Sequence, residues 1–196
     1  MKIPKSYKQL TVKQFQEISS LQEDEIKDTL DLFVERFAIL SNEDPEHIKT
    51  KVPYQDLISL AEKMRWLNKL PSESKINWFI FKGIPYRMTN LLKMSLGEFA
   101  LLDDLITDSM ISNAHKILAI MFRPIGFDKY DEDSFIKRSN TFKSLTMDIA
   151  YPSLLFFYRI VWVALSFILR EENQLQQTME TQMKKEDLNQ QIIGIG

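Results

Sequence analysis

The sequence predicts a mainly α-helical fold with a minor β component: a multi-helix domain with one small β-hairpin around residues 75–89. Three observations lead to this fold class. Apolar residues recur at helical spacing along most of the chain, the spacing of strands occurs in a single stretch, and glycine accounts for only 5 of 196 residues. Few glycines disfavour β-sandwiches and barrels, whose turns need backbone with positive φ. We expect residues 1–170 to form this helical domain and residues 171–196 to form a C-terminal extension.

The first third of the chain predicts four helices. Thr11 and Gln14 fit a capping box, in which each side chain satisfies a backbone N–H at the start of a helix. A second helix is expected over residues 24–40, and Asp44–Pro45 supply an N-cap and a first-turn proline for a third. Residues 54–68 form the fourth, an amphipathic helix. The residues expected to face inward from it are Leu57, Leu60, Ala61, Met64 and Leu67.

A change of apolar spacing in the middle of the chain predicts the hairpin. Residues 76–81 and 84–88 are typical of two strands, with Gly83 at the turn between them. Pro85 has no backbone N–H to donate. We therefore expect it to place the second strand at an edge of the sheet or to shorten that strand.

Helices are predicted again after the hairpin. Ser95 and Glu98 fit a second capping box, at the start of a helix that extends to about residue 108. Asn113 is expected to cap a further helix, which Arg123–Pro124 terminates. Beyond it we expect a polar, acidic loop over residues 126–134 and a short helix over residues 135–140.

The longest apolar run, residues 154–169, allows two interpretations. It is apolar on almost all sides except at Arg159 and Ser166, so a central helix wrapped by other helices or by a neighbouring subunit is the favoured one. A membrane-associated protein is the alternative. About 20 apolar residues are needed to cross a bilayer, however, and this shorter run contains an arginine.

Composition and motifs point away from catalysis and from cofactor or metal binding. The chain has no cysteine, which removes thiolate ligands and favours an intracellular protein. Its two histidines, His47 and His115, lack the spacing of metal ligands. Asp103 and Asp104 are neighbours on a predicted helix and do not face each other, and the acids of residues 128–133 lack the register of a calcium loop. We expect a non-enzymatic protein without cofactor or metal.

The predicted hairpin combines aromatic and basic side chains. Its aromatic residues are candidates for contact with a partner protein: Trp78, Phe79, Phe81 and Tyr86. Its basic residues, over the segment 75–93, are Lys75, Lys82, Arg87 and Lys93. Because aromatic rings stack on bases while cations hold phosphates, a nucleic-acid-associated protein is an alternative. The formal charge of −2 gives no overall basic excess, and paired strands bury aromatic residues for stability, so core packing and protein contact are favoured.

The segment 171–196 differs in composition from the rest of the chain. It is polar and glutamine-rich, with five acids against two lysines and few aliphatic residues to bury. Such a segment is expected to become ordered through a partner. Gln174 and Gln177 are therefore further candidates for partner contact.

Four segments resemble small virion and tail-assembly proteins of tailed bacteriophages. They are Thr11-Val-Lys-Gln-Phe-Gln-Glu-Ile, Asn77-Trp-Phe-Ile-Phe-Lys-Gly-Ile-Pro-Tyr, Ser95-Leu-Gly-Glu-Phe-Ala-Leu-Leu-Asp-Asp and Asn113-Ala-His-Lys-Ile-Leu-Ala-Ile-Met-Phe-Arg-Pro. The resemblance covers residues 8–160 and transfers no catalytic residue. It implies either a virion component, such as a head–tail connector or ring protein, or a tail assembly chaperone. The implied partners are other phage structural proteins, including copies of this chain, in the host cytoplasm during assembly or in the virion.

Overall fold

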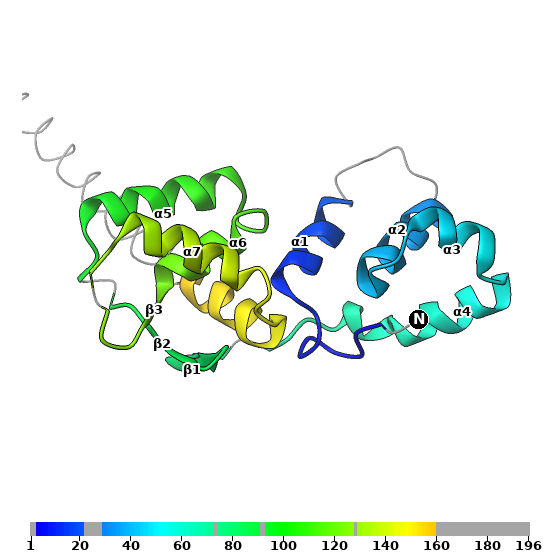
Figure 1. Ribbon diagram of the computed structural model, residues 1–196, viewed down its shortest axis with the longest axis horizontal. Coiled ribbons are helices and arrows are strands. Elements are labelled where there is room, and N and C mark those ends of the chain that lie inside the picture. Colours follow the sequence, from blue (N-terminus) through cyan, green and yellow to red (C-terminus); the bar gives the residue numbers. More distant parts are fainter. Residues whose placement is uncertain (1–2, 22–28, 73, 91–92, 128, 160–196) are drawn as a thin grey trace, which may run out of the picture. The chain divides into compact units, whose positions relative to one another are not determined.

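The computed structural model describes residues 3–21, 29–72, 74–90, 93–127 and 129–159 (Figure 1). The described chain is mainly helical with a small antiparallel sheet, which confirms the predicted fold class. It divides into two compact units, residues 1–156 and 157–196. The boundary expected at residue 170, the end of the apolar run and the candidates Gln174 and Gln177 lie outside the described residues.

The helices of the first unit are α1 (Val12–Ser20), α2 (Thr29–Ser41), α3 (Pro45–Lys51), α4 (Tyr54–Lys63), the 3-10 helix η1 (Arg65–Asn68), α5 (Leu96–Ser109), α6 (Ala114–Met121) and α7 (Glu132–Phe142). The strands are β1 (Trp78–Phe81), β2 (Ile84–Met88) and β3 (Phe122–Pro124). Residues 147–159 are also helical.

Local sequence signals set the starts of several helices as predicted. Thr11 and Gln14 form both hydrogen bonds of a capping box at α1, and Ser95 and Glu98 do the same at α5. Asp44 accepts a hydrogen bond from the Glu46 amide at the start of α3. These side chains satisfy amides that have no partner within their own helix.

Two helix starts differ from the prediction. Asn113 stands at the N-cap position of α6 but makes no capping bond, because its amide donates to the Leu105 carbonyl and to Asp108. Helix α7 begins three residues earlier than expected, because Asp131 accepts a hydrogen bond from the Ser134 amide and acts as its N-cap.

The predicted hairpin is present, with β1 and β2 antiparallel. Lys82 and Gly83 form its two-residue turn, with φ of 50° and 77°. Positive φ at both turn positions gives the twist that a tight hairpin requires, and glycine adopts it without strain.

The expectation that Pro85 lies on an edge strand is wrong. The strand order is β1-β2-β3, so β2 is central. Proline is tolerated there because it lies where the β2–β3 ladder ends: the Pro85 carbonyl accepts from the Ile125 amide at 3.0 Å, and only the reciprocal bond is missing. Strand β3 itself was not predicted, since Phe122–Pro124 appeared only as the end of a helix.

The start of the described chain pairs with a segment more than 130 residues away. Thr11 forms an isolated antiparallel bridge with Thr146, and the Val12 amide donates to the Leu145 carbonyl at 2.9 Å. The Met147 amide donates to the Leu10 carbonyl at 2.8 Å. This pairing fixes α1 against the start of the helix at 147–159.

Helix α6 lies in the core. Seven of its eight residues are buried, and it contacts α1, α5, α7 and β3. The largest fully buried side chains are Phe37, Phe122, Phe142, Leu10, Ile48, Leu102, Ile117, Leu118, Ile120, Met121, Leu145 and Met147.

Helix α4 was expected to bury one face, and the structure corrects this expectation. No residue within α4 is buried. Met64, at its C-cap, is the buried member of the predicted inward set, whereas Leu57, Leu60 and Leu67 are half-buried and Ala61 is exposed. The apolar side of α4 is therefore only partly covered by the described chain.

Candidate protein-binding surfaces

The outer face of the hairpin exposes large apolar side chains. Trp78 is 60% exposed and Ile80 is 62% exposed, and the two follow each other on one side of β1. Across β2 they face Arg87 and Pro85. Apolar side chains so exposed and adjacent are typical of a surface that contacts another protein.

The inner face of the hairpin belongs to the core. Phe79 and Tyr86 are directly opposite each other and stack with ring centroids 5.6 Å apart. Phe79 also packs edge-on against Phe122 at 4.9 Å, and Tyr86 against Phe142 at 5.0 Å. Phe81 is half-buried and lies 6.2 Å from the ring of Phe142.

The four aromatic candidates therefore differ in exposure: Phe79 and Tyr86 are buried, Phe81 is half-buried and Trp78 is exposed. Burial removes Phe79 and Tyr86 from direct contact with a partner, because strand alternation turns them toward α7 and β3. Trp78 alone is fully at the surface. Sequence reasoning missed Ile80, although its place two residues after Trp78 was the signal that could have found it.

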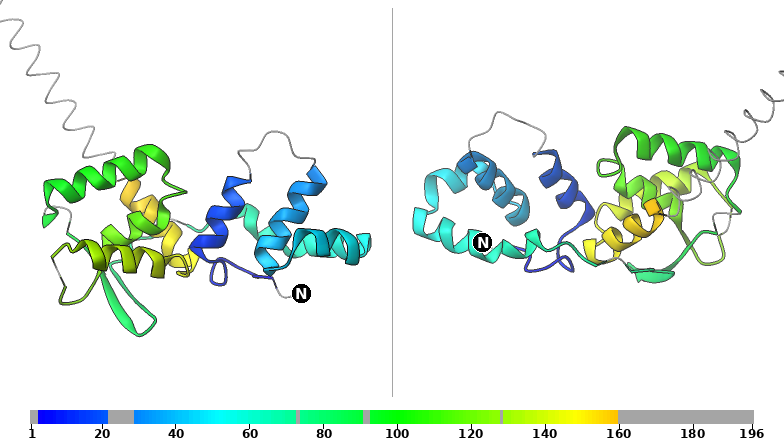
Figure 2. Two further views of the ribbon diagram at one scale, coloured as in Figure 1. Left: turned by 45° about the horizontal axis from the view of Figure 1, so that its top comes forward. Right: turned by 180° about the vertical axis from the view of Figure 1, so that it is seen from behind.

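Strand β1 is a free edge of the sheet within the described chain. The Met88 amide donates to the Asn77 carbonyl at 2.8 Å. In an antiparallel pair every second residue bonds to the partner strand, so Asn77, Phe79 and Phe81 bond to β2 and the residues between them do not. The backbone groups of Trp78 and Ile80 consequently point away from β2. A row of such groups next to exposed apolar side chains is a template for an added strand. The left view of Figure 2 shows the hairpin projecting from the helices.

The basic residues of the predicted nucleic-acid surface are all exposed: Lys75, Lys82, Arg87 and Lys93. Two of them lie against aromatic rings, with Lys75 Nζ 5.7 Å from the Phe156 ring centroid and Lys82 Nζ 5.5 Å from that of Phe81. Arg87 lies opposite the exposed Trp78 on the neighbouring strand.

A buried ion pair anchors the sheet to α5. Glu98 and Arg123 are each 5% exposed, and their side chains form a hydrogen-bonded ion pair. The other Glu98 oxygen accepts from the Ser95 amide and hydroxyl, both at 2.9 Å. Nearby, Arg138 Nε donates to the Ala119 carbonyl at 2.8 Å, and burial followed by the charge of Arg123 lowers its pKa. Glu98 thus joins a helix cap to the core strand β3.

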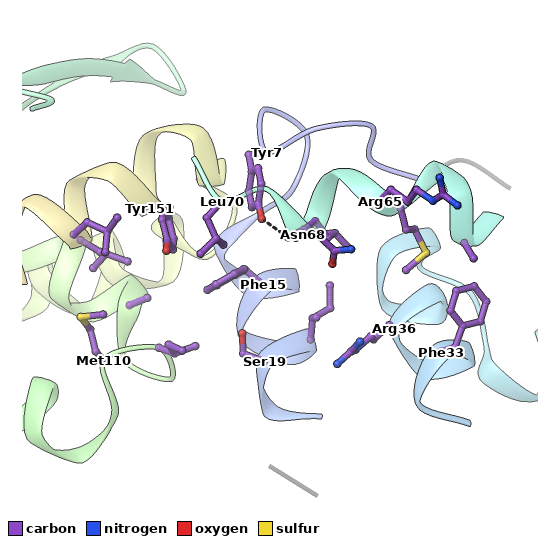
Figure 3. Close-up of a pocket in the computed structure, with 18 residues that line it drawn as sticks. Tyr7, Phe15, Ser19, Phe33, Arg36, Arg65, Asn68, Leu70, Met110 and Tyr151 are labelled. Atoms are coloured by element: carbon purple, nitrogen blue, oxygen red, sulfur yellow. Dashed lines mark hydrogen bonds between the residues drawn. The ribbon is translucent and has the colours of Figure 1, made fainter. Parts of the chain in front are cut away.

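A second candidate surface is a cleft of about 540 Å³ (Figure 3). Its walls come from α1, α2, α4, η1, the α5–α6 connection and the helix at 147–159. The apolar lining residues include Phe15, Phe33, Leu70, Met110 and Tyr151. No sequence motif marks this cleft, because its walls come from five segments that are separate in sequence.

Polar side chains reach the cleft from several elements: Tyr7, Ser19, Arg36, Arg65, Asn68 and Tyr151. The Tyr7 hydroxyl already donates its hydrogen to the Leu67 carbonyl at 2.9 Å. Burial raises the pKa of Tyr7. Arg65 lies 3.7 Å from Glu62 in an exposed ion pair. Arg36 differs, because its Nε is buried and has no hydrogen-bond partner among the described residues. In Figure 3, Arg36 extends from α2 toward α1, where Ser19 lies.

His115 links α1 to α6 through Gln16. It is buried, and its Nδ1 lies 3.1 Å from Gln16 Nε2, which also donates to the Ile111 carbonyl at 2.9 Å. Burial, followed by the charges of Lys143 and Lys116, lowers the pKa of His115 to about 4. The imidazole is therefore neutral near pH 7 and accepts the amide hydrogen of Gln16 at Nδ1.

Among the described residues there is no group of three or more metal-ligating side chains, and no helix there is long and apolar enough to cross a membrane. No protein-family model, no curated protein and no solved structure matches this chain.

Proposed function

We propose that this chain is a non-enzymatic assembly protein of a tailed bacteriophage, which binds other phage structural proteins through β1. The observation that carries protein binding is the free edge of β1 with its exposed Trp78 and Ile80. Support for the phage assignment is the resemblance of the segments quoted above. The protein acts in the host cytoplasm during assembly, as a virion component or as a tail assembly chaperone.

The hairpin is suited to adding a strand from a partner. Main-chain hydrogen bonds along an open edge give affinity, and alternate side chains give specificity. The flanking Lys75 and Lys82 are cationic, and they discourage pairing of β1 with a second β1, because an antiparallel pair would bring like charges close together. The partner strand is therefore apolar and flanked by acids.

Two substitutions at Ile80 test the edge without breaking the hairpin. Ile80→Pro removes an outward backbone N–H and so blocks strand addition, whereas the β1–β2 bonds do not use that group. Ile80→Thr is the matched control, because it removes the apolar side chain and keeps the N–H. We expect Ile80→Pro to lower the amount of this protein in assembled particles or tail complexes by at least about tenfold, and Ile80→Thr to lower it less.

Quantitative mass spectrometry of purified particles and of tail assembly intermediates provides the measurement. A fixed copy number in particles identifies a virion component, and presence in the intermediates alone identifies a chaperone. Equal incorporation of the wild type and Ile80→Pro would contradict the edge contact. Absence from both fractions would contradict the assembly role.

The nucleic-acid alternative is separated by its salt dependence. If the exposed basic residues bind phosphates, affinity for a single-stranded DNA oligonucleotide falls steeply with salt, and charge reversal at Lys75, Lys82 and Arg87 abolishes it. The assembly proposal predicts no such binding at physiological salt.

A further inference from the structure

We propose that the cleft lined by Phe15, Arg36 and Leu70 binds an alkyl-chain carboxylate, with the carboxylate at Arg36 and the chain along the apolar walls. This site is separate from β1 and goes beyond the proposed assembly function. Its volume of about 540 Å³ falls within the range of small-molecule sites, which bury an apolar ligand and orient it with a few polar groups.

The positive charge of the lining residues favours a ligand with an anionic head group. The residues lining the cleft include two cations, Arg36 and Arg65, and no acid. Arg65 already has Glu62 as its partner. The buried Nε of Arg36 lacks an acceptor among the described residues, and a buried donor without an acceptor is costly. A carboxylate supplies the acceptor and the opposite charge together, in a geometry that a guanidinium matches with two parallel bonds.

The apolar walls of the cleft favour a ligand whose remaining part is a hydrocarbon chain. The cleft is formed by aromatic and aliphatic side chains from several elements, including Phe33, Met110 and Leu155. Besides the two arginines, the polar side chains of the lining are Tyr7, Ser19, Asn68 and Tyr151, and the Tyr7 hydroxyl is already bonded to a carbonyl. A saturated chain matches such walls, whereas a sugar or nucleotide would leave its hydroxyl groups without partners.

Matched twelve-carbon probes test the head group on the full chain. Dodecanoate, dodecanol and dodecyltrimethylammonium share the chain and differ in charge, and each is titrated below its micelle concentration by calorimetry. We expect dodecanoate to bind most tightly and the cation least. Shortening the probe from dodecanoate to decanoate and octanoate should weaken binding by about fourfold for each methylene lost.

Substitutions locate the site. Arg36→Gln should weaken dodecanoate at least tenfold and leave dodecanol unchanged, because a hydrogen bond to a charged group is lost. Arg65→Gln is the matched control, since Arg65 is exposed and paired, and it should change affinity less than threefold. Ala61→Phe fills the cleft from the exposed side of α4 and should abolish binding of both probes. Circular dichroism verifies that each variant is folded.

Three outcomes overturn the proposal. One is equal affinity for dodecanoate and dodecyltrimethylammonium, and another is an unchanged dodecanoate affinity in Arg36→Gln. The third is the absence of binding by every probe. If that result accompanies exclusion of Ala61→Phe from assembled particles, the cleft is a docking groove for a partner helix. None of these outcomes depends on β1, so failure here and failure of the assembly function are distinguishable.

Discussion

Helices α4 and α6 have similar lengths but opposite environments. Seven of the eight residues of α6 are buried, whereas none of the ten residues of α4 is. Both helices follow the apolar spacing of the sequence. The difference lies in what covers them: α6 is enclosed by helices and a strand, while α4 is only partly covered and contributes one residue, Ala61, to the lining of the cleft. Helical spacing therefore indicates which side of a helix is apolar but does not supply the element that covers it.

The largest expected difference between the two environments concerns ion pairs. Glu98→Gln leaves Arg123 buried without its carboxylate and should lower the free energy of unfolding by about 3–5 kcal/mol. Glu62→Gln breaks the exposed pair with Arg65, beside α4, and should cost about 0–1 kcal/mol. Urea denaturation measures both. Equal losses would contradict the assignment of one pair to the core and the other to the surface.

The same contrast applies to leucines. Leu118→Ala, in α6, should lower the free energy of unfolding by about 2–5 kcal/mol, because a fully buried side chain is lost and a cavity remains. Leu57→Ala, in α4, should cost less than about 1 kcal/mol, since that side chain is half-buried. The comparison fails if Leu57→Ala destabilises the protein as much as Leu118→Ala.

The core around α6 should also respond to pH through His115. Its pKa is about 4 in the folded state and 6.5 ordinarily. Between these values the unfolded chain binds a proton that the folded chain does not, so stability is full above pH 6.5 and falls as pH decreases toward 4. At 1.36 kcal/mol per pKa unit the loss is at most about 3 kcal/mol, and solvent screening reduces it.

Replacement of the histidine isolates this effect. His115→Asn retains a polar side chain near Gln16 but cannot take up a proton in this range. Its free energy of unfolding should vary less than that of the wild type between pH 6.5 and pH 4.5, as measured by urea denaturation. An identical pH slope in both proteins would assign the dependence to other groups.

The smallest expected effects compare two glycines. Gly83→Ala, in the hairpin turn at φ of 77°, should destabilise the protein by about 1–2 kcal/mol, because a Cβ is unfavourable there. Gly97→Ala, in the first turn of α5, should stabilise it by about 0.4–1 kcal/mol, since helical backbone suits alanine and no atom lies within 4 Å of the new Cβ. Thermal unfolding distinguishes the opposite signs.

Local signals explain what the sequence could predict. The capping boxes at Thr11 and Ser95, the Asp44–Pro45 start and the Gly83 turn each depend on a few adjacent residues, and all are present. Strand β3 and the pairing of Thr11 with Thr146 were not predicted, because they depend on segments that are distant in sequence.

The candidate sites were harder to predict for a related reason. Residues 78–81 are all apolar, so alternation separates Trp78 from Phe79 but does not tell which face is buried. The structure resolves this through Phe122 and Phe142, which cover the inner face. No sequence pattern marks Arg36 as a site residue, because the cleft that it lines forms only when several helices pack together.

Hydrogen exchange compares α4 and α6 in one experiment. Helix α6 lies in the core, whereas the apolar side of α4 and the outer face of β1 are only partly covered by the described chain. In the free protein, amides of residues 54–63 should exchange by local opening, orders of magnitude faster than those of residues 114–121. Equal protection of the two helices would contradict the account.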